Sequence, residues 1–142
     1  LVGEIGGVRY YNDSAATAPA AALAALAALD RPIVLIAGGA DKNLDFTELG
    51  GAIARRVKAL VLLDGTATAK LERSVRAAGD AAIVGPVGSM AAALAQAQAL
   101  AGPGDAVLLS PGCASFGLFA NEFDRGDQFK RAVRSLQQGV RQ

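Results

Sequence analysis

The sequence contains no histidine, no tryptophan and only one cysteine among its 142 residues. Without histidine, the chain cannot by itself build a Ser-His-Asp or Cys-His catalytic arrangement, because both need an imidazole base. A single cysteine excludes an intrachain disulfide, and the lack of histidine argues against a protein-built zinc site. We therefore assign no catalytic residue and no metal ligand to this chain, and we expect Cys113 to be a small buried hydrophobe.

The sequence also lacks an excess of charge of either sign. Lys and Arg number 14 against 13 Asp and Glu, a net charge of +1, so the strongly basic surface of a dedicated nucleic-acid binder is missing. The longest apolar run, Ala15 to Leu29, is mostly alanine and is interrupted by Thr17 and Pro19. It falls short of the roughly 18 apolar residues that cross a bilayer. These features predict neither a nucleic-acid partner nor a membrane partner.

The start of the chain carries no visible targeting segment. Leu1 to Gly7 contains Glu4 and lacks a basic stretch followed by an apolar block, so no signal peptide is expected. We take a cytoplasmic location as the default. Because the first residue is Leu rather than Met, we expect the chain to be a fragment of a longer protein.

Hydrophobic residues are abundant, at 52% of the chain against 19% charged residues, which argues against disorder and fits one folded domain. Short apolar runs alternate with helical patterns along the whole sequence. Strands are predicted at Ile33–Ile36, Ala59–Leu63, Ala82–Val84 and Ala106–Leu109, after an edge hairpin of Val2–Ile5 and Val8–Tyr11. Helices are predicted near residues 21–29, 47–56, 67–78, 89–100 and 127–138, the first with Thr17 as N-cap and Pro19 in its first turn.

This alternation predicts the fold class. Nearly continuous apolar strands separated by helices indicate a parallel sheet covered on both faces. We therefore predict an α/β, three-layer, Rossmann-like domain with a mostly parallel sheet, helices on both faces and an N-terminal edge hairpin. Right-handed crossovers place the carboxyl ends of the parallel strands at one edge, and ligands of such folds bind outside that edge.

Four loops should line that edge, namely residues 12–17, 38–42, 64–66 and 110–115. Thr17 places a hydroxyl beside the free N–H groups of a helix start, an arrangement suited to an anion. Lys42 adds a compact cation on a glycine-rich turn. The glycine and small residues before Ser115 permit close approach of the backbone to a ligand. Together these groups predict a small, strongly anionic ligand such as a dicarboxylate.

Each of these residues also has a purely structural interpretation. Thr17 fits an N-cap, Lys42 a solvated loop lysine and Ser115 the start of a turn. Asp13 fits an Asx turn at a strand-to-helix corner, and Asp64–Gly65 a simple turn. Neither a Gly-x-x-x-x-Gly-Lys-Ser/Thr loop nor a Gly-x-Gly-x-x-Gly motif occurs, so the predicted sheet is not a self-sufficient ATP or NAD site.

Three segments of the chain resemble the C-terminal domain of the Mur ligase family of peptidoglycan synthesis. They are Gly-Val-Arg-Tyr-Tyr-Asn-Asp-Ser-Ala-Ala-Thr at 7–17, Gly-Gly-Ala-Asp-Lys-Asn-Leu-Asp-Phe at 38–46, and Leu-Leu-Ser-Pro-Gly-Cys-Ala-Ser-Phe-Gly-Leu-Phe at 108–119 with Asp-Arg-Gly-Asp-Gln-Phe at 124–129. Their order and spacing cover nearly the whole chain. The resemblance is strongest to members that add D-glutamate to UDP-N-acetylmuramoyl-L-alanine.

The resemblance implies an ATP-dependent, ADP-forming ligase that works through an acyl phosphate, which the amine of D-glutamate then attacks. In the family, N-terminal and central domains hold the UDP-sugar, the ATP and the Mg²⁺ ions. Residues 1–142 are therefore expected to be a single C-terminal, amino-acid-binding domain that packs against two domains outside this chain. The expected ligands are D-glutamate, UDP-N-acetylmuramoyl-L-alanine and ATP, with ATP and Mg²⁺ held mainly by the absent central domain.

The resemblance also implies residue roles. Thr17 and Lys42 match positions that bind the carboxylates of D-glutamate, Ser115 and Phe116 match the pair that closes over the same amino acid, and Asp13 matches a nucleotide contact.

Two departures from the family pattern concern the same regions. The family commonly reads Asn-Asp-Ser-Lys-Ala-Thr-Asn, whereas this chain has Ala15 and Ala18 in place of the lysine and the second asparagine. Glu122, followed by Phe123, stands where the family tends to have an aromatic residue. A related ligase for another amino acid, or a non-catalytic α/β ligand-binding module, therefore stays open as an alternative.

Overall fold

The computed structural model describes the backbone of residues 1–141 and the side chains of residues 1–139. In chain order its elements are β1 (Gly3–Ile5), β2 (Val8–Asn12), α1 (Pro19–Ala28), β3 (Ile33–Ala37), α2 (Thr47–Arg56), β4 (Val57–Leu63), α3 (Thr68–Ala78), β5 (Ile83–Val87), α4 (Met90–Leu100), β6 (Ala106–Leu109) and α5 (Glu122–Arg141). None of the helices in this described part is both long enough and apolar enough to span a membrane.

The strands form one six-stranded sheet in the order β1-β2-β6-β3-β4-β5. Strands β2 to β6 are parallel, and β6 enters between β2 and β3 with Ile33 opposite Ala106 and Ile36 opposite Leu109. Strand β1 pairs antiparallel with β2 across Gly6 and Gly7, whose φ angles of 58° and 81° suit a two-residue hairpin turn. The predicted fold class is confirmed, including its edge hairpin.

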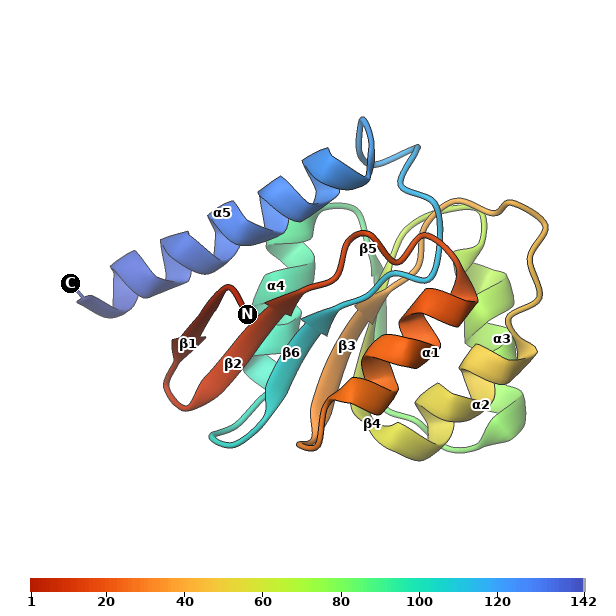
Figure 1. Ribbon diagram of the computed structural model, residues 1–142, viewed down its shortest axis with the longest axis horizontal. Helices are drawn as coiled ribbons and strands as arrows, with labels where there is room; N and C mark the ends of the chain where they lie inside the picture. Colours follow the sequence, from red (N-terminus) through yellow and green to blue (C-terminus); the bar gives the residue numbers. More distant parts are fainter. Residues whose placement is uncertain (142) are drawn as a thin grey trace.

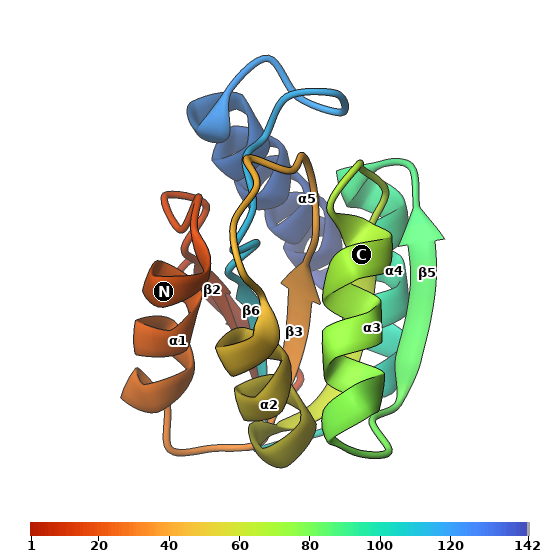
Figure 2. The same cartoon turned by 90° about the vertical axis from the view of Figure 1, so that its right-hand side faces the viewer.

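Helices cover the sheet on both faces, with α1, α2 and α3 on one side and α4 and α5 on the other (Figures 1 and 2). Strand β3 shows how one strand serves both cores. Its residues Val34 and Ile36 pack in the cluster with α4 and α5, whereas Ile33 and Leu35 pack in the cluster with α1, α2 and α3. Because all five residues of β3 are buried, the strand is apolar throughout rather than alternating.

Three element boundaries differ from the sequence-based expectation. The last strand before α4 was predicted at Ala82–Val84 but covers Ile83–Val87, so it also includes Gly85 and Pro86. Pro86 is tolerated because β5 lies at an edge of the sheet. Helix α1 begins at Pro19 with Ala18 as its N-cap, so the prediction that Thr17 caps it is wrong.

Helix α5 also starts five residues earlier than predicted, at Glu122 rather than near 127. The side chain of Asn121 accepts the N–H of Asp124 at 2.8 Å and so starts the helix. Gly126 lies inside α5, where a β-carbon would come within 3.0 Å of the side-chain nitrogen Nδ2 of Asn12. The glycine therefore lets α5 approach the end of β2 closely.

At the amino ends of the strands, Asp105 ties three strands together. Its carboxylate accepts from Lys58 Nζ at 2.6 Å and from the Gly102 N–H at 2.8 Å, and its carbonyl accepts the N–H of Arg9 at 3.1 Å. Burial pushes the pKa of Asp105 up, but the hydrogen bonds from Lys58 and Gly102 and the attraction of Lys58 outweigh it, so this pKa lies below its ordinary value. The charged carboxylate is thus the form that the fold stabilises.

We expect Asp105→Asn to lower the free energy of unfolding at pH 7 by about 1 kcal/mol, the scale of one charge-assisted hydrogen bond to a partly exposed lysine. The pKa of Asp105 is lower in the folded than in the unfolded chain, so the charged carboxylate stabilises the fold above the unfolded pKa. This stabilisation is lost as the pH falls through the folded pKa. The difference in free energy of unfolding between Asp105→Asn and the wild type should therefore shrink below about pH 4. Urea unfolding between pH 7 and pH 3 measures this. Glu72→Gln, in an exposed pair with Arg76, is the matched control, and a pH-independent difference would contradict the prediction.

Candidate functional site

The loops that follow β2, β3, β4 and β6 meet at one edge of the sheet and are joined by backbone hydrogen bonds. Gly112 N–H donates to Ala16 O at 2.9 Å, and Gly38 N–H donates to Pro111 O at 3.0 Å. Ala40 and Ala114 exchange two hydrogen bonds of 2.9 and 3.2 Å, forming an isolated antiparallel bridge. This network fixes the loops of Thr17, Lys42 and Ser115 against one another.

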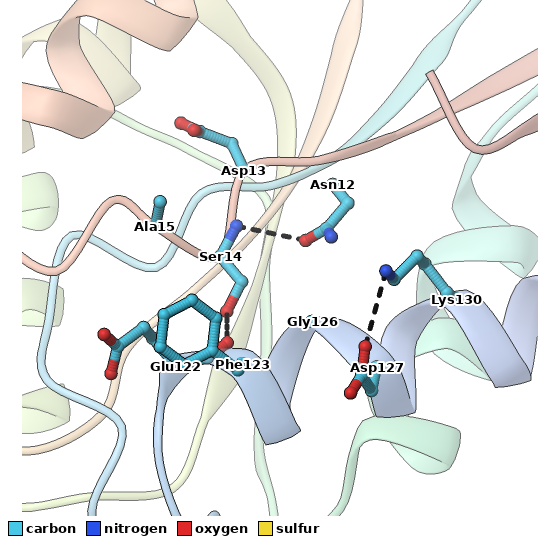
Figure 3. Close-up of a pocket in the computed structure, with 9 residues that line it drawn as sticks. All are labelled: Asn12, Asp13, Ser14, Ala15, Glu122, Phe123, Gly126, Asp127 and Lys130. Carbon is cyan, nitrogen blue, oxygen red and sulfur yellow. Dashed lines mark hydrogen bonds and ion pairs between the residues drawn. The ribbon is translucent and has the colours of Figure 1, made fainter.

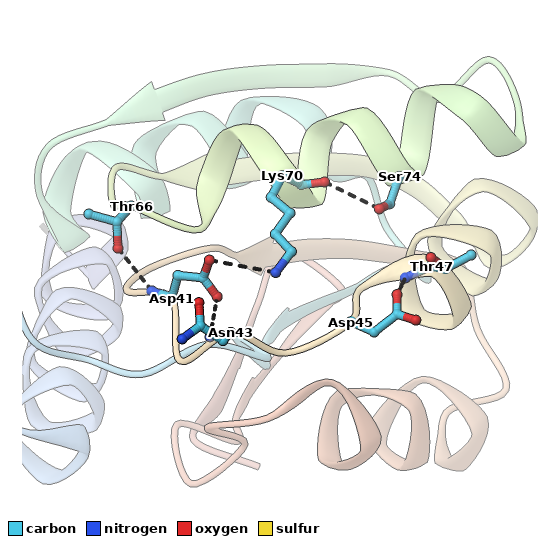
Figure 4. Close-up of polar contacts among 7 residues, drawn as sticks. All are labelled: Asp41, Asn43, Asp45, Thr47, Thr66, Lys70 and Ser74. Atoms are coloured by element: carbon cyan, nitrogen blue, oxygen red, sulfur yellow. Dashed lines mark hydrogen bonds and ion pairs between the residues drawn. The ribbon is translucent and has the colours of Figure 1, made fainter.

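The shape of the loop that carries Lys42 depends on its two chain neighbours, Asp41 and Asn43, whose contacts are drawn in Figure 4. The Asp41 carboxylate accepts the N–H of Asn43 at 2.8 Å, and Asn43 takes a φ of 60°, which asparagine tolerates better than most residues. Asp41 in turn donates its N–H to Thr66 Oγ1 at 2.9 Å. The backbone at Lys42 is therefore fixed while its side chain stays exposed.

The Asp41 carboxylate has a second support. Lys70 Nζ lies 3.6 Å from Asp41 Oδ2 and 5.4 Å from the centroid of the Phe46 ring. Thr66 lies in the 64–66 loop that was predicted to line this edge, although no role was assigned to it. Lys70 was not predicted as part of the site, because it acts on the Lys42 loop only through the position of α3 in the fold.

Ser115 lies in a narrow crevice between the loops after β3, β4 and β6. The crevice is lined by Gly39, Leu63, Asp64, Ala114, Ser115, Phe116, Leu118, Phe119 and Arg125. Ser115 is buried there, whereas the ring of Phe116 is 58% exposed. The two residues that the sequence pairs therefore differ: one side chain lines the crevice floor, and the other stands at its mouth, free to contact a ligand or another domain.

Asp13 lines a separate cavity of about 210 Å³ between the β2–α1 loop and α5, with its carboxylate directed away from Phe123 and Lys130 (Figure 3). Its carboxylate accepts from Ser110 Oγ at 2.8 Å. The Asx turn at this corner is made by Asn12, whose Oδ1 accepts the N–H of Ser14 at 3.1 Å, so that role does not belong to Asp13. The full lining is Asn12, Asp13, Ser14, Ala15, Glu122, Phe123, Gly126, Asp127 and Lys130.

Two of the three residues that depart from the family pattern line this cavity. Ala15 and Glu122 line it together with Asp13, Ala18 does not, and none of the three lines the crevice of Ser115. Among the described residues, the basic side chain in the lining is Lys130, whose Nζ lies 3.3 Å from Asp127 Oδ1. Ala15 and Glu122 therefore change the surroundings of Asp13 rather than those of Ser115.

Sequence reasoning missed Arg125, although it is buried to 1% exposure. Its Nε and Nη2 donate to Ser14 Oγ and Ser14 O at 2.9 and 2.7 Å, and its Nη1 donates to Cys113 O at 3.0 Å. An arginine next to a glycine in a polar stretch gives no signal of burial. The burial of Arg125 arises only in the folded chain, where α5 packs against the loops of Ser14 and Cys113.

Cys113 is buried, as predicted, and burial raises the pKa of its thiol to about 12. The thiol is therefore protonated at neutral pH and is not poised for nucleophilic attack. Within the described residues, no group of three or more His, Cys, Asp or Glu side chains is placed to hold a metal ion.

A mostly parallel α/β sheet with its loops gathered at the carboxyl edge defines a Rossmann-like domain of the ligand-binding kind. Residues 1–113 match the family described as "Mur ligase, glutamate ligase domain". The chain belongs to the Mur ligase family.

Similar proteins extend over almost the whole chain. It is 59% identical over 137 residues to the UDP-N-acetylmuramoylalanine–D-glutamate ligase of Roseiflexus sp. strain RS-1, covering 96% of this chain and 29% of that protein. It is 49% identical over 130 residues to the protein of the same name from Symbiobacterium thermophilum, covering 92% of this chain and 28% of the relative. The chain thus spans less than a third of the length of these relatives.

A solved structure shares the fold. A domain from a putative UDP-N-acetylmuramate:L-alanyl-gamma-D-glutamyl-medo-diaminopimelate ligase of Haemophilus ducreyi superposes with a TM-score of 0.58 at 14% identity, covering 92% of this chain and 95% of that one. At this identity the likeness establishes the architecture alone.

Proposed function

We propose that this chain is the amino-acid-binding, C-terminal domain of an ATP-dependent, ADP-forming ligase that joins D-glutamate to UDP-N-acetylmuramoyl-L-alanine in peptidoglycan synthesis. The observation that carries the proposal is the 59% identity, over 96% of this chain, to a relative named for that reaction. The UDP-binding and ATPase domains would then lie elsewhere in the longer protein, in which this chain packs against them.

In this proposal, D-glutamate occupies the joined loops at the carboxyl edge of the sheet. Lys42 and Thr17 hold its carboxylates, because an ammonium and a hydroxyl near a helix start both favour anions. Ser115 supplies a hydroxyl from the crevice, and Phe116 closes over the bound amino acid from its mouth. Asp13, in the adjoining cavity, contacts the nucleotide.

The task of these residues in the reaction is to orient one reactant. The carboxylate of UDP-N-acetylmuramoyl-L-alanine takes the γ-phosphoryl group of ATP, and ADP leaves. The amine of D-glutamate then attacks the acyl phosphate, and phosphate departs as the amide forms. Holding both carboxylates of D-glutamate fixes where its amine points, and such positioning converts a bimolecular attack into an effectively unimolecular one.

Mg²⁺ is expected to be bound outside this chain. No cluster of three suitable ligand side chains occurs among the described residues, so we derive no step of the reaction from a metal held here.

The test is ADP release by the full-length protein with UDP-N-acetylmuramoyl-L-alanine and one candidate amino acid at a time. We expect product with D-glutamate and none with L-glutamate or diaminopimelate. Product with a different amino acid would identify a related ligase instead. No ADP release, together with full-strength binding of D-glutamate by the isolated chain, would identify a non-catalytic binding module.

A further inference from the structure

The guanidinium of Arg125 is a buried charge that forms no salt bridge with the described residues. It lies in the first turns of α5 at 1% exposure, and none of the described carboxylates comes within 4.0 Å of it. Burying an unpaired charge is costly, and a well-packed apolar side chain would stabilise a core at least as well. Filling space in the core therefore does not account for an arginine at this position, and its hydrogen bonds indicate its role.

Its contacts join two of the three loops that carry the proposed glutamate ligands, those of Thr17 and Ser115. Two nitrogens bind Ser14, which lies three residues before Thr17, and the third binds the carbonyl of Cys113, two residues before Ser115. The Ser14 hydroxyl accepts from Arg125 Nε and donates to the carbonyl of Glu122 at 2.6 Å. One side chain thus connects the β2–α1 loop, the β6–α5 loop and the first turn of α5.

Arg125 also lines the Ser115 crevice itself. The crevice also contains Asp64, and the charge of Glu122 attracts the guanidinium, so Arg125 does not by itself make the crevice attractive to an anion. Its contribution is to the geometry of the loops.

We propose that Arg125, acting through Ser14, is a positioning residue that sets the Thr17 loop against the Ser115 loop for binding D-glutamate. This inference rests on the proposed function. Lysine would not replace arginine here, because an ammonium is a point charge without the planar fork that reaches Ser14 and Cys113 together. The donor atoms act on the loops and do not touch the substrate.

The experiment compares Ser14→Ala and Arg125→Lys with the wild type in the full-length protein. Ser74→Ala is the matched control, because the hydroxyl of Ser74 on α3 also donates to a backbone carbonyl, that of Lys70, at 3.2 Å. We expect Ser14→Ala to raise the KM for D-glutamate about tenfold, since small misplacements of substrate-holding groups are costly. The KM for UDP-N-acetylmuramoyl-L-alanine should change less than about twofold, because the substitution does not affect the groups that bind that substrate.

A merely structural role would reduce the amount of active protein and so lower kcat without this split between the two KM values. An unchanged KM for D-glutamate, or an equal rise in both KM values, would overturn the proposal. If Arg125→Lys does not fold, Ser14→Ala decides the matter alone, since it keeps the charge and the other two contacts of Arg125.

A second measurement separates this inference from the proposed function. In Ser14→Ala, amide hydrogen exchange in residues 13–17 and 113–116 should quicken about tenfold relative to Ser74→Ala, as local opening becomes easier. If the wild-type protein gives no product with D-glutamate, both the proposed function and the ligand named here are wrong. If the wild type is active but Ser14→Ala exchanges amide hydrogens in both segments as slowly as Ser74→Ala, only the positioning role is wrong.

Discussion

Lys42→Ala in the full-length protein is expected to raise the KM for D-glutamate at least about 30-fold, with a smaller effect on kcat. The substitution leaves a substrate carboxylate without its cation in a partly dry site, which costs about 2 kcal/mol or more. Because Lys42 is exposed in the free domain, its loss should leave the stability of the fold nearly unchanged. Steady-state kinetics of ADP release, with D-glutamate varied and the other substrates saturating, measures the change.

Two further variants make this result interpretable. Arg76→Ala removes the same charge from an exposed position on α3, where Arg76 pairs with Glu72, and should leave the KM for D-glutamate within about twofold of the wild type. Lys42→Arg keeps the charge but changes its shape, so a partial recovery is expected. An unchanged KM in Lys42→Ala would remove this residue from the site.

The fold was predictable because its strands are unambiguous in the sequence. Ile33–Ile36 and Ala106–Leu109 are apolar at every position, and only a parallel sheet covered on both faces buries such strands completely. Once the strands are parallel, the loops after them must share an edge, as the hydrogen bonds between Ala40 and Ala114 confirm. Periodicity therefore sufficed for the architecture.

Details that depend on tertiary contacts escaped the sequence analysis. The last helix was predicted from about residue 127, yet it begins at Glu122 and contains Gly126, where it approaches Asn12 and Ser14. Arg125 received no role, yet it is buried because two loops present carbonyl oxygens to it. Ala18, which has no capping side chain, precedes α1 in place of the expected Thr17. For Gly126 and Arg125, partners distant in the chain decide the outcome.

Glycines allow the loops at the site to lie in direct backbone contact. A β-carbon at Gly39 would come within 2.5 Å of the Ala114 carbonyl oxygen. A β-carbon at Gly65 would overlap the carbonyl of Gly39 and approach its Cα to 2.7 Å. That same carbonyl accepts the N–H of Ala67 at 2.8 Å. At these two glycines, the loops after β3, β4 and β6 thus lie backbone against backbone.

We therefore expect Gly65→Ala to destabilise the 142-residue chain by about 3 kcal/mol, at the upper end of overpacking effects, because the added methyl group meets backbone rather than a movable side chain. For a domain of this size the unfolding midpoint should fall by roughly 10 °C. In the full-length protein, the KM for D-glutamate should rise as well, since the Lys42 loop must move away from Thr66. Thermal unfolding followed by circular dichroism measures the first effect and steady-state kinetics the second.

Gly88→Ala is the matched control for this prediction. A β-carbon at Gly88 would meet nothing within 4 Å, and the backbone there has no positive φ, so its free energy of unfolding should stay within about 0.5 kcal/mol of the wild type. Equal midpoints for Gly65→Ala and Gly88→Ala would mean that the loops relax without cost. The close backbone stack would then not be what holds Lys42 and Ser115 in place, and the rigidity of the site would have to come from the hydrogen bonds of Asp41 and Arg125 instead.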